Sequence, residues 1–235
     1  MRYIISGAGR GLGLEFTRQL LSRGDSVVAG TRSPDSARQL QAMAVDSGGR
    51  LRVLQLDVAD PRSVRAFAEE VRGGEPPDVL LNNAAVFGKI QPLDELDTED
   101  MVATFSTNVA GPLRLSSALL PVLRRGSARR IIHLSSVLGS ISSHTEGSGP
   151  FSTCYAIRTS KAALNMAMRT MALELAPEGF TTVSIHPGWV QTDMGGPLAP
   201  MRPEDSIRAM LGVIDGLRPE HNGRFFDFQG QELPW

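Results

Sequence analysis

The 235-residue sequence has little of several features that define large classes of protein. Its one cysteine, Cys154, excludes an internal disulfide framework and favours a reducing compartment. A formal net charge of -1 gives no general attraction to nucleic acid or to an anionic membrane. No apolar run approaches the ~20 residues of a membrane span, and MRYIISGAG has too few apolar residues for a signal peptide. We expect a cytoplasmic protein with neither nucleic-acid nor membrane partners.

Short β-branched segments alternate with longer helical patterns along the whole chain. The expected strands are RYIIS, SVVAGTR, LRVLQLDV, DVLLNNAAV, RIIHLSS, TTVSIHPG and GRFFDF. This alternation predicts βαβ units, and therefore one α/β domain over residues 1–235 with a mainly parallel sheet covered on both faces. Ser33 before Pro34 and Asp60 before Pro61 predict capped helix starts. The Ser, Thr and Gly in residues 139–154 predict a mobile loop.

A glycine-rich segment, SGAGRGLG at residues 6–13, ends the first expected strand and opens a helix. Gly7, Gly11 and Gly13 give the spacing G-x-x-x-G-x-G, which differs from the usual dinucleotide pattern G-x-G-x-x-G. Glycines at such a junction let backbone N–H groups approach a pyrophosphate, whose charge the helix N-terminus favours. The simpler alternative is a tight corner between strand and helix.

The second expected strand ends in AGTRS, at the position where a dinucleotide fold meets the adenosine ribose. An acidic side chain there would bind the 2′-hydroxyl of NAD, but this sequence has Thr31 and Arg32. Arg10, in the glycine turn, is placed to reach the same 2′-phosphate, and two guanidiniums on one phosphate bind it strongly. The sequence therefore predicts NADP(H). The alternative is a pair of solvent-facing arginines.

Seven motifs follow one another in order: SGAGRGLG, LDV, NNAA, TNVAGP, LSSVLGS, RTSKAALN and HPGWVQTDM. Through them the chain resembles the short-chain dehydrogenase/reductase family from end to end. Within that family it resembles the myxobacterial C-factor-like branch, through HPGWVQTDMGGP and GLRPEHNGRFFDFQGQELPW. The resemblance implies a Rossmann-type, doubly wound sheet in the order 3-2-1-4-5-6-7. It also implies an oxidoreductase that uses NADP(H) on a small carbonyl or alcohol substrate.

The resemblance further implies which residues hold the cofactor. The glycine turn and the second strand supply Gly7, Arg10, Gly11, Leu12, Gly13, Thr31 and Arg32. Asp57 and Val58 belong at the adenine, and Asn83, Ala84 and Ala85 at the neighbouring ribose. Pro187, Gly188, Val190 and Thr192 belong at the nicotinamide carboxamide, and Lys161 at the nicotinamide ribose. Ala85 replaces the family's usual glycine, which is a small perturbation.

Family members transfer hydride with the help of Asn, Ser, Tyr and Lys. Asn108, Ser136 and Lys161 occupy the matching positions here, but Ile157 stands where the proton-exchanging tyrosine belongs. Tyr155 is the alternative phenol. Helix positions i and i+6 differ by roughly 240°, so only an unwound helix start would bring Tyr155 to the face of Lys161. Other candidate donors are Ser136 with Lys161 and water, or His144 in the loop.

Loss of a positioned general acid typically costs ~10² to 10⁴ in rate, which leaves three functions open. The chain is an oxidoreductase of altered activity, an NADP(H)-binding signalling or scaffold protein with little turnover, or an isomerase or lyase on the same fold. The helices that pair in family dimers carry apolar stripes here, which predicts a homodimer or homotetramer; the alternative is that these stripes pack on the sheet. His133, His186 and His221 lack metal-ligand spacing with one another or with Cys154, and we expect no metal.

Overall fold

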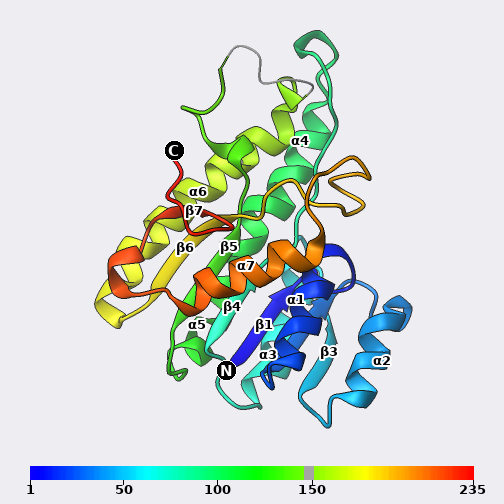
Figure 1. Cartoon of the computed structure of the whole chain (residues 1–235), viewed down its shortest axis with the longest axis vertical. Coiled ribbons are helices and arrows are strands. Elements are labelled where there is room, and N and C mark those ends of the chain that lie inside the picture. Colours follow the sequence, from blue (N-terminus) through cyan, green and yellow to red (C-terminus); the bar gives the residue numbers. More distant parts are fainter. Residues whose placement is uncertain (146–150) are drawn as a thin grey trace.

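The computed structural model describes residues 1–145 and 151–235, and its centre is a seven-stranded parallel sheet (Figure 1). The strands are β1 (Arg2–Ser6), β2 (Ser26–Thr31), β3 (Leu51–Gln55), β4 (Val79–Asn82), β5 (Arg130–Leu134), β6 (Thr181–His186) and β7 (Phe225–Asp227). They lie in the order β3-β2-β1-β4-β5-β6-β7, and each neighbouring pair is parallel. The predicted fold class and strand order are confirmed.

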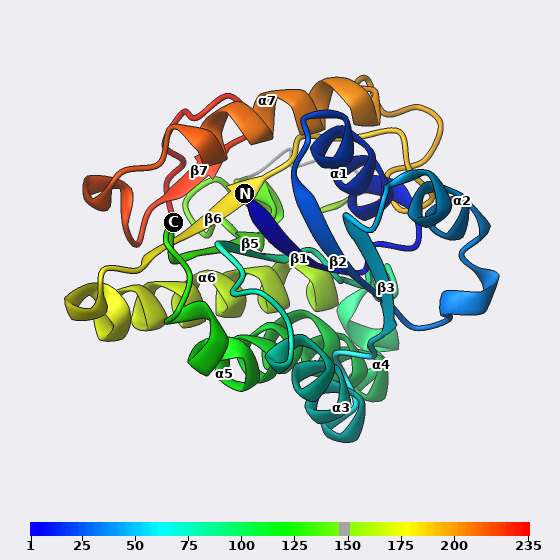
Figure 2. The same ribbon diagram turned by 90° about the horizontal axis from the view of Figure 1, so that it is seen from below.

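Helices cover both faces of this sheet. They are α1 (Gly11–Ser22), α2 (Arg38–Asp46), α3 (Pro61–Arg72), α4 (Thr98–Phe105), α5 (Gly111–Leu123), α6 (Tyr155–Leu175) and α7 (Pro203–Asp215). Figure 2 shows α1, α2 and α7 on one face, and α3, α4, α5 and α6 on the other. A π-helical turn, Ser106–Ala110, joins α4 to α5 without a break.

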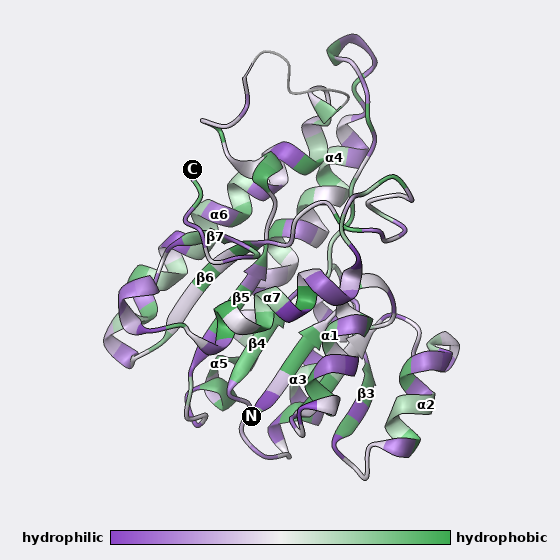
Figure 3. Ribbon diagram, viewed as in Figure 1, coloured by the Kyte–Doolittle hydropathy of each residue, from purple (hydrophilic) through white to green (hydrophobic). Residues whose placement is uncertain are grey.

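Most strands are rich in hydrophobic residues (Figure 3), as expected where helices cover both faces of a sheet. Successive side chains of a strand point to opposite faces. Ile4 and Leu80 accordingly pack in one core cluster with Phe67 of α3, whereas Ile5 and Leu81 belong to the cluster on the other face. The sheet is thereby fixed between two layers, and the loops at the carboxyl ends of its strands have a rigid base.

The two predicted helix starts have different outcomes. Asp60 caps α3 as predicted, since its Oδ1 accepts a hydrogen bond of 2.8 Å from the backbone N of Arg62. The prediction for Ser33 is wrong, because its side chain makes no capping bond and Pro34–Ser36 is only a 3₁₀ turn. Ala37 ends that turn with a non-helical ψ of 61°, so α2 begins afterwards.

The predicted loop over residues 139–154 is described only in part, since residues 146–150 lie outside the described residues. Its first residue completes a 3₁₀ turn, Val137–Gly139, directly after β5. Within residues 1–145 and 151–235, none of the helices combines the length and the apolarity that crossing a membrane requires.

Candidate active site

The glycine-rich turn between β1 and α1 is too tight for side chains at several positions. Gly7 and Gly11 have φ angles of 69° and 53°, in the left-handed region that favours glycine. A Cβ on Gly13 would lie 2.3 Å from the carbonyl oxygen of Gly7, and one on Gly9 would lie 2.6 Å from Thr31 Oγ1. No side chain caps α1, so a bound anion is a suitable partner for the N–H groups of its first turn.

The end of β4 is locked to this turn through Asn83. Its Nδ2 donates to the carbonyl oxygens of Ser6 at 2.9 Å and Gly7 at 3.1 Å. The hydroxyl of Ser6 in turn accepts from the backbone N of Asn83 and of Ala84, both at 3.1 Å. The NNAA motif thus sets the position of the glycine turn relative to the sheet.

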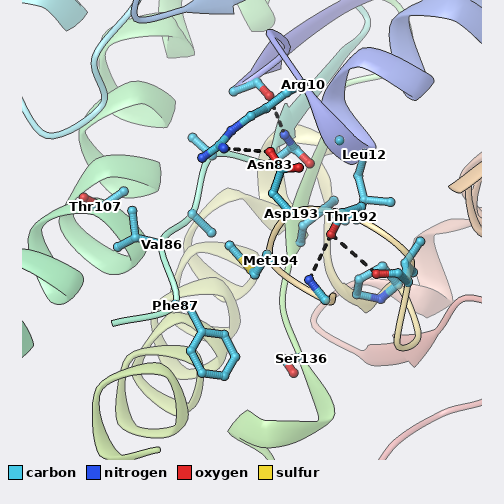
Figure 4. A pocket seen from close by; sticks show the side chains of 18 of the residues that line it. Arg10, Leu12, Asn83, Val86, Phe87, Thr107, Ser136, Thr192, Asp193 and Met194 are labelled. Carbon is cyan, nitrogen blue, oxygen red and sulfur yellow. Dashed lines mark hydrogen bonds and ion pairs between the residues drawn. The ribbon is translucent and has the colours of Figure 1, made fainter. Parts of the chain in front are cut away.

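A cleft of about 760 Å³ lies across the carboxyl ends of the strands (Figure 4). Most of the predicted cofactor residues line it: Gly7, Arg10, Gly11, Leu12, Thr31, Arg32, Asp57, Val58, Asn83, Ala84, Ala85, Lys161, Pro187, Gly188, Val190 and Thr192. Gly13 is not in the lining, because it packs behind the turn against Gly7. Segments that are far apart in the sequence therefore meet at one cavity.

The two predicted phosphate-binding arginines differ in their present contacts. Arg10 makes an exposed ion pair with Asp193, with 2.8 Å between Nη1 and Oδ2, which joins the glycine turn to the segment after β6 (Figure 4). Arg32 is exposed at the end of β2 and lines the same cleft. Exposed ion pairs are worth about 0 to 1 kcal/mol, so Arg10 is easily released.

Ser136, Ile157 and Lys161 meet in the cleft lining, and Tyr155 does not join them. Helix α6 begins at Tyr155, so the unwound helix start that Tyr155 would need is not formed. Ile157 and Lys161 are four residues apart and share one face of α6. Ile157 is only 3% exposed, and it lines the same cleft as Ser136 and Lys161.

Lys161 is a buried cation, with 4% of its surface exposed. Its Nζ donates a 2.6 Å hydrogen bond to the carbonyl oxygen of Leu134, at the end of β5. Burial lowers the pKa of Lys161 to about 8, because desolvation disfavours the charged amine. Burial, and secondly the charge of Lys161, lower the pKa of His133 on β5 to about 3. Near neutral pH Lys161 is therefore close to its own titration range.

Asn108 lies outside the cleft lining and braces the segment after β4. Its Oδ1 accepts from the backbone N of Val86 at 2.9 Å, and its Nδ2 donates to the carbonyl oxygen of Val86 at 2.8 Å and to Ser160 Oγ at 3.1 Å. The π-helical turn carries Asn108 to this position. A water-holding role for Asn108 stays a prediction, whereas its role in positioning Val86 is visible.

The sequence analysis did not single out several residues that line the cleft. Phe87, Phe151, Trp189, Met194 and His186 all line the cavity, and most lie in irregular loops without a periodic signal. Burial lowers the pKa of His186 to about 4.

The candidate donor His144 is exposed and is not in the cleft lining. Among the residues that the structure describes, no group of three or more His, Cys, Asp or Glu is arranged to hold a metal.

A doubly wound parallel sheet, a glycine-rich turn after its first strand and a cleft over the carboxyl ends of its strands define a Rossmann-type dinucleotide-binding protein. The family model for short chain dehydrogenases matches residues 2–203, and the chain belongs to this family.

Comparison with known proteins supports this assignment. The C-signal protein of Myxococcus xanthus is 56% identical over 172 residues, which cover 73% of this chain and 100% of that relative. An uncharacterised oxidoreductase of Schizosaccharomyces pombe is 33% identical over 99% of this chain and 97% of its own length.

Two solved structures match the whole chain. The carbonyl reductase Sniffer of D. melanogaster has a TM-score of 0.93 at 31% identity, covering 100% of this chain and 99% of the other. An NADPH-bound carbonyl reductase from chicken fatty liver has a TM-score of 0.92 at 32% identity, covering 100% and 98%. The resemblance inferred from the sequence motifs is confirmed.

Proposed function

We propose that the protein is an NADP(H)-dependent oxidoreductase that interconverts a small carbonyl compound and its alcohol. The observation that carries the proposal is the juxtaposition of the glycine turn with Thr31 and Arg32 along one cleft. A positive charge at the end of the second strand favours the 2′-phosphate of NADP over the free hydroxyl of NAD. The NADPH bound by the chicken carbonyl reductase supports the same choice.

The residues of the cleft fit the dinucleotide. The turn at Gly7 and Gly11 would hold the pyrophosphate, Arg32 and a released Arg10 the 2′-phosphate, and Asp57 the adenine end. NADPH, when bound, supplies a hydride for the carbonyl carbon. Lys161 would hold the nicotinamide ribose, since it is one of the residues that line the cleft.

The proton has to come from groups other than a phenol at position 157. Ser136 accepts a 3.1 Å hydrogen bond from the backbone N of Leu138, which leaves its O–H to donate to a carbonyl oxygen. Lys161, which has a pKa of about 8 and lines the same cleft, would supply the proton through water. We therefore expect turnover only with reactive carbonyls, or with substrates that supply part of their own acid catalysis.

The second candidate is an NADP(H)-binding protein with little turnover, in a signalling or scaffold role. Buried Ile157 in the lining, with Tyr155 outside it, favours this alternative. The name of the C-signal relative is compatible with it. An isomerase or lyase on this fold stays a hypothesis.

Calorimetric titration with NADPH and NADH tests the cofactor. We expect NADPH to bind at least about ten-fold more tightly, and Arg32→Ala to remove most of that preference. Arg38→Ala is the matched control, since Arg38 is exposed on α2 and outside the cleft lining. Equal or tighter binding of NADH would contradict the proposal. NADPH consumption with a panel of aldehydes and ketones then separates the two candidates, because binding without consumption favours the second.

A further inference from the structure

Three aromatic rings border the end of the cleft that holds Ser136 and Ile157, and the proposed proton and hydride transfers use none of them. Phe87 follows β4, Phe151 precedes α6 and Trp189 follows β6. The ring centroids of Phe87 and Phe151 are 6.1 Å apart, and those of Phe151 and Trp189 are 6.0 Å apart. Interplanar angles of 65° and 82° make both contacts edge-to-face, with Phe151 in the middle.

Each ring is held by contacts of its own segment. Trp189 Nε1 donates to the carbonyl oxygen of Gly195 at 2.7 Å, and Arg158 Nε donates to the carbonyl oxygen of Phe151 at 2.8 Å. The turn after Phe87 lies against α6, since a Cβ on Gly88 would be 2.6 Å from Ala156 Cβ. Three separate loops thus bring the rings together, and the edge-to-face contacts between the rings reduce the ordering that a ligand has to impose.

Charge is distributed unevenly along the cleft. The charged lining residues other than Lys161 are Arg10, Arg32, Asp57 and Asp193, which belong to the glycine turn, to the ends of β2 and β3, and to the Arg10–Asp193 ion pair. The ring end adds apolar Val137, Leu138, Ile157 and Met194. Figure 4 shows Arg10 and Phe87 at opposite ends of the opening, with Ser136 at the end of Phe87. Lys161 also lies near this end, one helical turn from Ile157, but its ammonium is bonded to the carbonyl oxygen of Leu134. The rest of the ring end therefore suits an uncharged, apolar group.

We propose that Phe87, Phe151 and Trp189 form a subsite for an aromatic ring carried by the carbonyl substrate. The inference rests on the proposed function, because the reacting carbonyl has to lie near Ser136 while the ring of the substrate enters the subsite. Aromatic rings prefer edge-to-face or offset partners, and the exposed edges of this triad offer both. Ile157 widens the apolar wall, since it replaces the hydroxyl that a tyrosine would place there.

The test compares 1-phenylethanol with 1-cyclohexylethanol, which differ only in the aromaticity of the ring. Trp189 reports binding by its fluorescence in a Trp235→Phe background, which removes the other of the chain's two tryptophans. With NADP⁺ present, the phenyl compound should bind about ten-fold more tightly and change the emission of Trp189. Phe151→Leu should bring the two affinities together, whereas Phe105→Leu, outside the cleft lining, should leave the preference intact.

Equal affinities in the parent, or a preference that survives both Phe151→Leu and Trp189→Leu, would overturn the subsite. Calorimetry replaces fluorescence for Trp189→Leu, and circular dichroism checks that each variant is folded. NADPH consumption with benzaldehyde and cyclohexanecarbaldehyde separates this result from the proposed function. Tighter binding of the phenyl compound without any NADPH consumption would contradict the proposed oxidoreductase activity but still support a subsite for an aromatic ring. NADPH consumption with no preference for the aromatic ring, in binding or in kcat/KM, would support the oxidoreductase activity and contradict the subsite.

Discussion

At the scale of single residues, the site is defined by two neighbours on one face of α6. Lys161 is buried with its ammonium bonded to the carbonyl of Leu134, and Ile157 lies one turn before it in the same cleft. The resemblance places a tyrosine at position 157. Apart from Lys161, the proposed cofactor residues lie on other segments, so the loss of the phenol leaves them in place while removing the proton donor that the resemblance implies.

Replacing Ile157 with Tyr should therefore raise NADPH-dependent carbonyl reduction by ~10² to 10⁴, the usual contribution of a positioned general acid. The cleft beside Ile157 has room for a phenol to extend into it. Steady-state NADPH oxidation measures the change. Ile157→Phe supplies the same bulk without the hydroxyl and should show no gain, and Tyr155→Phe should behave as the parent. A gain in Ile157→Phe equal to that in Ile157→Tyr would show that packing, not proton transfer, is responsible.

Lys161→Met should change the free energy of unfolding in a pH-dependent way. The folded-state pKa of Lys161 is about 8, below the value of about 10.4 in an unfolded chain. Between these values the unfolded chain binds more protons, so this group makes the parent more stable as pH rises from about 8 to about 10.4. Below pH 8 the buried amine is charged, so its full desolvation penalty lowers the free energy of unfolding of the parent. The gain from Lys161→Met should be largest there, up to about 3 kcal/mol less the cost of leaving the Leu134 carbonyl unbonded.

Urea unfolding at pH 7 and pH 9.5 measures this difference. The same substitution at Lys89, the other lysine of the sequence, serves as the control, because Lys89 is exposed. If the free energies of unfolding of the parent and of Lys161→Met differ by the same amount at both pH values, the amine does not have the desolvation that its burial indicates.

At the scale of elements, the sequence predicted the strands and their order well and the loops poorly. Buried β-branched runs such as SVVAGT have a local signal, and the ordered motifs imply the topology that the sheet shows. Ser33 shows the limit of local reasoning, because a favourable dipeptide produced only a 3₁₀ turn. Phe87, Phe151 and Trp189 come together only through tertiary packing. The Arg10–Asp193 ion pair likewise joins residues 183 positions apart, which no local pattern encodes.

The turn between β1 and α1 gives a prediction at this scale. Gly13→Ala would place a methyl group 2.3 Å from the Gly7 carbonyl oxygen and 2.7 Å from Asn83 Nδ2, so the turn and its clamp have to shift. We expect a loss of about 1 to 3 kcal/mol in the free energy of unfolding and a weaker affinity for NADPH. Thermal unfolding and calorimetry measure the two effects. Gly73→Ala, where nothing lies within 4 Å, should be harmless; similar losses in both variants would refute the close-approach argument.

At the scale of the whole molecule, the homodimer or homotetramer stays a prediction. Exposed apolar residues on α6 and α4 make it testable. Met166 and Leu173 are 67% and 63% exposed, and they lie seven residues apart on one face of α6. Val102 of the neighbouring α4 is exposed as well. Apolar side chains gathered on one surface favour association.

Met166→Glu should therefore lower the oligomeric mass measured by light scattering, because a charge would be buried in the contact. Leu198→Glu changes an even more exposed apolar residue outside the helices and should leave the mass unchanged. A parent protein that is monomeric at every concentration measured would exclude this contact.

The π-helical turn at Ser106–Ala110 makes this part of the chain sensitive to the deletion of a residue. Helix residues advance by roughly 100° each, so deleting one residue there would tighten the turn and swing everything beyond it by that angle about the axis. Asn108 would then lose Val86 and Ser160, and α5 would offer the wrong side to β4. Single-residue deletions should accordingly be far less tolerated in this stretch than in the loops that flank the continuous helix from α4 to α5.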